Sequence, residues 1–212
     1  LCDRRQRQMC IRDSPLSISS ALREIATKKE YTEKDLFAYR GLWHSPMHHG
    51  FFSASTQEET LQHINVRLQQ ARKAMQQLDW LMLTFGTAYV YEQKETGKVV
   101  ANCHKLPESN FNRRLLLVDE IVDEYTSLIT SLAARNPNLK ILFTVSPIRH
   151  IRDGMHANQL SKSTLLLAID RLQQFFPQHV FYFPSYEIVL DELRDYLSLI
   201  HISEPTRQAE IS

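Results

Sequence analysis

The strongest constraint on the fold of this chain is an alternation of long amphipathic helical patterns with short apolar segments. The clearest helical pattern follows Thr56, where Thr56 and Glu59 have the spacing of a capping box and apolar residues recur every three or four positions. Helical patterns of crossover length between apolar strands favour a mainly parallel sheet with helices on both faces. The expected helices cover residues 15–26, 57–78, 115–135, about 160–176 and 185–196. The expected strands cover 80–91, with an interruption at Gly86-Thr87 near its end, 98–101, 139–145 and 180–183.

The segment before Thr56 has weaker patterns. A second short helix is expected from Thr32, and residues 41–55 hold Gly, Pro and Ser without a period, which predicts a long structured loop. Ligands of parallel sheets bind beyond the carboxyl ends of the strands. Ligand-binding residues are therefore expected in Gly86-Thr87, residues 146–154 and residues 184–187.

Charge and composition argue against two classes of function. Residues 1–14 have a net charge of +2 and residues 197–212 of −1, and the remainder holds 20 basic and 20 acidic residues without a basic patch. We therefore expect no nucleic-acid partner. No apolar run approaches the ~20 residues that span a bilayer, so no membrane span is expected. The sequence leaves the compartment and the oligomeric state open, although Cys103, the single thiol outside the terminal segments, slightly favours the reducing cytoplasm.

A cluster of histidines follows Trp43. His44, His48 and His49 lie within six residues, and neutral imidazoles of this density can ligate a transition metal. No acidic or cysteine ligand lies nearby, and the spacing fits no zinc pattern. We therefore expect histidines that hydrogen-bond to the backbone and line a cleft, with no metal bound.

Three further clusters carry polar chemistry. Asn102 to Lys105 places Cys103 beside His104, a pair that suggests a thiolate nucleophile. Neighbours in an extended segment point to opposite faces, however, so a packed cysteine in a polar loop is expected.

After the strand that ends near residue 145, Arg149 and Arg152 could bind an anion and His150 could act as an acid or base. The alternative is a loop held by an Arg–Asp bridge. Ser161-Lys162-Ser163 is expected to cap a helix, with a solvated lysine.

Several strings follow one another in order along the chain: Pro-Leu-Ser-Ile at 15–18, Leu42 to Ser45 with His48-His49, Leu83 to Ala88 with Val90-Tyr91, Val100 to Lys105, Thr144 to Pro147 with Arg149-His150 and Arg152 to Gly154, Tyr182 to Ile188, and Asp191 to Tyr196. Together they resemble the GSCFA family, which is similar to the SGNH/GDSL hydrolases.

This resemblance implies a fold and a chemistry. The implied fold is an incomplete three-layer α/β/α sandwich with a mainly parallel, SGNH-like sheet. The implied reaction is hydrolysis of a small-molecule or carbohydrate ester by a serine nucleophile, with a histidine as base and an aspartate that orients it. No cofactor is implied.

The sequence departs from the family pattern at the expected catalytic residues. It contains neither a Gly-Ser-Cys-Phe-Ala string, which carries the expected nucleophile, nor an Asp-x-x-His-Pro-Ser string. His201 and Ser203 imitate the second string, but no aspartate lies three residues before His201. Residues 1–14 and 197–212 resemble translated sequencing adapter. We therefore expect residues 15–196 to be a partial domain, residues 1–14 and 197–212 to be foreign, and this chain to be inactive.

The resemblance still nominates residues for the cleft. Gly86 and Thr87 lie where relatives supply an oxyanion-side group, and the other candidates are His44, His48, His49, Asn102, His104, Ser146, Arg149, His150 and Ser185. Two other functions stay open: a noncatalytic carbohydrate-binding domain that uses the same cleft, and a metal site at residues 44–49.

Overall fold

A parallel sheet of three strands organises the fold. The computed structural model describes residues 14–27, 29–76, 78–101, 106–149 and 153–193. Strands β3 (Trp80–Phe85), β7 (Lys140–Val145) and β8 (Val180–Phe183) are parallel and lie in the order β3-β7-β8. The predicted strands at 139–145 and 180–183 are confirmed to within one residue at each end.

The helices lie close to where the sequence pattern predicts them. They are α2 (Pro15–Ala26), α3 (Gln57–Met75), α4 (Val118–Arg135), α5 (Gly154–Phe175) and α6 (Ser185–Glu187), which continues into a π-helical turn at Ile188–Glu192. The predicted cap of α3 is present, because the Glu59 amide donates to the Thr56 hydroxyl at 3.2 Å. Helix α5 differs, since it begins at Gly154 rather than near residue 160.

One face of the parallel sheet forms the main core with α4 and α5. Phe85 and Phe143 point from β3 and β7 toward Tyr125 of α4, and the three rings lie 5.2 to 5.6 Å apart. Tyr125 is fully buried, and its hydroxyl donates to the Pro15 carbonyl at 3.0 Å, which ties α2 to α4. The structure thus confirms a mixed α/β fold whose parallel sheet packs against helices.

The opposite face of the parallel sheet is largely exposed in the part of the chain that the structure describes. Trp80, Met82 and Phe183 on this face are 42%, 72% and 50% exposed. Among the described residues, the helices that form the core therefore cover one face of the sheet, whereas the sequence pattern predicts helices on both.

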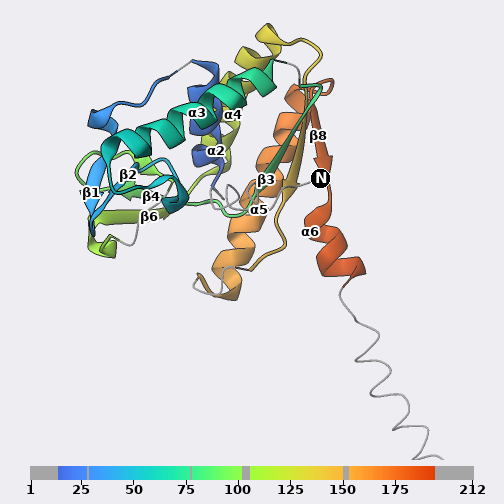
Figure 1. Cartoon of the computed structure of the whole chain (residues 1–212). Helices are drawn as coiled ribbons and strands as arrows, with labels where there is room; N and C mark the ends of the chain where they lie inside the picture. The colour runs from blue at the N-terminus through green and yellow to red at the C-terminus, as the bar shows by residue number, and fades with distance from the viewer. Residues whose placement is uncertain (1–13, 28, 77, 102–105, 150–152, 194–212) are drawn as a thin grey trace, which may run out of the picture.

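Two small antiparallel sheets accompany the parallel sheet (Figure 1), and one of them contacts α3. Strand β1 (Phe37–Tyr39) pairs with β2 (Leu42–His44), and β4 (Tyr89–Gln93) pairs with β5 (Val99–Val100) and β6 (Phe111–Leu115). The predicted long loop thus contains β2 and a 3₁₀ turn at Gly50–Phe52, and the helix expected from Thr32 is a single 3₁₀ turn at Glu33–Asp35.

The strand predicted over 80–91, with Gly86-Thr87 interrupting it near its end, is instead two strands that belong to different sheets. The chain leaves the parallel sheet after Phe85 and enters the antiparallel sheet at Tyr89. The intervening residues are held by α5, because the Ser161 hydroxyl accepts a hydrogen bond from the Ala88 amide at 2.8 Å.

Among the described helices, none is long and apolar enough to cross a membrane.

Candidate functional site

The carboxyl edge of the parallel sheet gathers polar residues from all three strands. Gly86 and Thr87 follow β3, Ser146 follows β7, and Ser185 lies two residues after β8. The Ser146 amide donates to the Phe85 carbonyl at 2.8 Å, and the Ser185 hydroxyl donates to the Val145 carbonyl at 2.9 Å. These four candidates from the sequence therefore lie along one edge, where parallel sheets bind their ligands.

Helix α5 closes this edge with two buried side chains. Ser161 lies 3.1 Å from the Thr87 hydroxyl and accepts the Ala88 amide. Lys162 is fully buried, and its ammonium donates to the Gly86 carbonyl and, at 2.6 Å, to the Ser146 carbonyl. One cation thus joins the segments that follow β3 and β7.

The expectation of a solvated Lys162 is wrong. The prediction placed residue 162 in the first turn of a helix that starts near 160. Because α5 starts at Gly154, Lys162 lies in the third turn, on the face that packs against the strand ends. The same face carries buried Asn158. The sequence pattern does not identify these two residues and Ser161 as site residues. A helix predicted to start at Gly154 would have placed all three next to the strand ends.

The histidines lie in a different part of the molecule, around β2 and α3. His44 and His48 are buried, and each contacts a serine through Nδ1: Ser53 at 2.7 Å and Ser45 at 3.0 Å. His49 Nδ1 accepts the Phe51 amide at 3.1 Å. His44 and His49 hydrogen-bond to the backbone as expected, whereas His48 contacts the Ser45 hydroxyl, and the expectation that the three rings line a cleft stays a prediction. In the described part of the chain, no group of three or more His, Cys, Asp or Glu side chains could hold a metal ion.

The pair of Ser53 and His44 has the distance of a nucleophile and its base. His44 Nε2 also lies 3.1 Å from the Tyr39 carbonyl, which fixes the ring. However, the Ser53 amide donates to Gly50 and the Ala54 amide donates to Thr60. The two amides closest to the hydroxyl are thus already engaged, and an oxyanion hole needs such donors. We therefore assign this pair a structural role.

The loop after β7 carries an ion pair that differs from the expected one. Arg149 is exposed, whereas His150 and Arg152 lie outside the described residues, as do Asn102 and His104. Asp153 pairs instead with Arg113 of β6 at 2.5 Å, and the Arg113 guanidinium lies 3.8 Å from the centre of the Tyr89 ring. The predicted Arg–Asp bridge within the loop stays a prediction, because Arg152 lies outside the described residues. The ion pair of Asp153 with Arg113 joins the loop to an antiparallel strand.

Strand β8 contributes a second interaction near this edge. The Tyr182 hydroxyl donates to Glu187 of α6 at 2.7 Å. Burial and the neighbouring carboxylate of Glu187 both raise the pKa of Tyr182 above its ordinary value. The protonated Tyr182 hydroxyl thus holds the end of α6 against the sheet.

These observations define a class: a mixed α/β protein with a buried polar cluster at the carboxyl edge of its parallel sheet. The chain belongs to the GSCFA family, whose pattern it matches over residues 5–206. A comparison with curated proteins and a comparison with solved structures each found no match.

Proposed function

We propose that the GSCFA domain is an SGNH-like serine hydrolase with a three-layer α/β/α fold that cleaves a small-molecule or carbohydrate ester. The observation that supports this proposal is the meeting of polar residues from all three parallel strands at one edge. Packing alone does not require Lys162 to be buried there, and burying a charge is costly unless it is well paired. A set of strand-end loops held this firmly suits a site that must keep its geometry during a reaction.

The proposed roles follow the position of each residue in the described structure. Gly86 and Thr87 supply the oxyanion side, because they form the turn directly after β3. Ser146 and Ser185 line the same edge, and their positions are fixed by backbone hydrogen bonds. Ser161 and Lys162 position these loops without contacting the substrate. The roles of Asn102, His104 and His150 stay predictions, since these residues lie outside the described ranges.

The nucleophile and its acid–base partners are expected in the two strings that the sequence of this chain does not contain. The proposal is therefore that these 212 residues hold the scaffold of the site and do not turn over an ester. The division of the chain at residues 15 and 196 stays a prediction.

An active-site probe tests this proposal. A GSCFA protein with both strings should react with a fluorophosphonate and should hydrolyse p-nitrophenyl acetate, and this chain should do neither. Labelling of this chain at any serine would overturn the claim that it is inactive. A relative with both strings that binds glycans but ignores both reagents would instead favour a noncatalytic carbohydrate-binding domain.

A further inference from the structure

A cavity lies at the amino edge of the parallel sheet, where β3, β7 and β8 begin. It has a volume of about 630 Å³, within the range of small-molecule sites. Strand β7 has six residues, which places this cavity about 17 Å from the carboxyl edge. The two sites are therefore separate.

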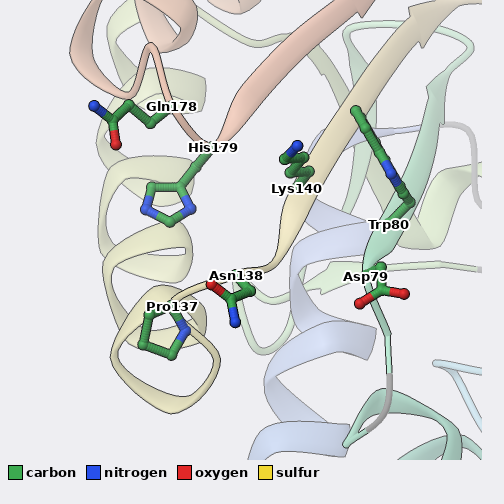
Figure 2. A pocket seen from close by; sticks show the side chains of 7 residues that line it. All are labelled: Asp79, Trp80, Pro137, Asn138, Lys140, Gln178 and His179. Carbon is green, nitrogen blue, oxygen red and sulfur yellow. The ribbon is translucent and has the colours of Figure 1, made fainter.

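The side chains of this cavity come from three different connections. Figure 2 shows Trp80 on one side, Gln178 and His179 on the other, and Lys140 between them, with Asp79 and Asn138 below. Trp80 and Lys140 are the first residues of β3 and β7, and the other lining residues lie one to three residues before a strand. Backbone hydrogen bonds hold the strand starts together: the Lys140 amide donates to the Asp79 carbonyl at 2.9 Å, and the Ile141 amide donates to the His179 carbonyl at 2.7 Å.

Two of the rings are fixed in orientation. The Trp80 ring is 42% exposed and packs against Phe181, with ring centres 5.4 Å apart. His179 Nδ1 donates to the Leu139 carbonyl at 2.9 Å, which makes Nε2 an acceptor in the neutral ring. A half-exposed indole and an oriented imidazole thus line the cavity at little cost in side-chain entropy.

The chemistry of the lining selects the class of ligand. Asp79 and Lys140 carry opposite charges, so the cavity does not favour an anion or a cation. Asn138 and Gln178 each offer a carbonyl acceptor and an amide donor, which suits a ligand with many hydroxyl groups. The electron-rich face of an indole attracts the weakly positive C–H groups of a sugar ring. A purely apolar ligand would leave most of these polar groups without partners.

We propose that the amino-edge cavity binds a neutral carbohydrate, with the Trp80 ring as the platform and with Asn138, Gln178 and His179 as hydrogen-bonding groups. Binding moves Lys140 away from the Trp80 ring, over which its ammonium lies at 5.3 Å from the ring centre. The freed face of the indole then carries the sugar ring.

The two tryptophans of the chain give a direct test by NMR of the indole N–H signals. Cellotetraose, maltotetraose and tetra-N-acetylchitotetraose are titrated in turn to about 10 mM, which is enough to detect a millimolar Kd. The Trp80 signal should shift and saturate with at least one of the three. The Trp43 signal, from β2, should stay in place and serves as the internal control.

A pair of matched variants separates binding from a change in fold. Asn138→Ala should weaken binding about tenfold through the lost hydrogen bonds. Asn112→Ala, at an exposed position of β6, should leave binding unchanged. The proposal is overturned if none of the three sugars gives a saturable shift of the Trp80 signal, if the two variants behave alike, or if heparin shifts this signal while the neutral sugars do not.

Discussion

Replacing Lys162 by methionine tests how the carboxyl edge is held together. The side chain of methionine has a similar length but no donor, so the carbonyls of Gly86 and Ser146 each lose a hydrogen bond. A buried carbonyl without a partner costs about 1–3 kcal/mol, which sums to about 2–6 kcal/mol. Removing the buried ammonium offsets part of this cost, because its desolvation penalty also disappears. We expect a net loss of about 2–4 kcal/mol.

Thermal and urea unfolding measure this loss. For a chain of this length the melting temperature should fall by about 4–16 °C. Lys98→Met is the matched control, since Lys98 is exposed, and it should change the free energy of unfolding by less than about 0.5 kcal/mol. If Lys162→Met is as stable as the unmodified chain, Lys162 does not hold these loops, and the account of the carboxyl edge is wrong.

Two further changes test the packing of α2 on α4. Tyr125→Phe removes the hydrogen bond to the Pro15 carbonyl and should lower the free energy of unfolding by about 1 kcal/mol. Urea unfolding measures this loss. An unchanged free energy would mean that the carbonyl forms a hydrogen bond with water in the variant. Burial raises the pKa of Glu124, but hydrogen bonds from Arg23 and Ser19 outweigh it, so the net pKa is lowered. This stabilisation is present above the unfolded pKa of about 4.3 and is lost as the pH falls through the lower folded pKa. Urea midpoints of Glu124→Gln and the unmodified chain should therefore converge at acidic pH, and parallel curves would contradict the shift.

Much of the helical framework could be predicted because its signals are local. Thr56 caps its helix as the sequence indicates, and α2 and α4 occupy the expected ranges to within three residues. The strands β7 and β8 were equally clear, since each is a short apolar run that ends at or just before a proline. Hydrophobic periodicity, together with capping residues and prolines at the ends, is enough to predict a segment that buries one continuous apolar face.

The rest depended on contacts between segments distant in sequence. Strand β6 was missed because Arg113 and Arg114 give it no apolar alternation, and their partners lie on other elements: Asp153 for Arg113, and Glu92 and Glu120 for Arg114. The break between β3 and β4 is held by Ser161, whose partners lie more than 70 residues away. The candidate-site residues at the strand ends could therefore be predicted from the sequence, whereas those that α5 supplies could not.

The proposed function makes the carboxyl edge of this fold the scaffold of a serine hydrolase. The most direct test is mass spectrometry of a GSCFA protein that contains both strings, after treatment with a fluorophosphonate. The account predicts one labelled serine, in the Gly-Ser-Cys-Phe-Ala string, and no label when that serine is replaced by alanine. An unlabelled protein that is otherwise folded would contradict it.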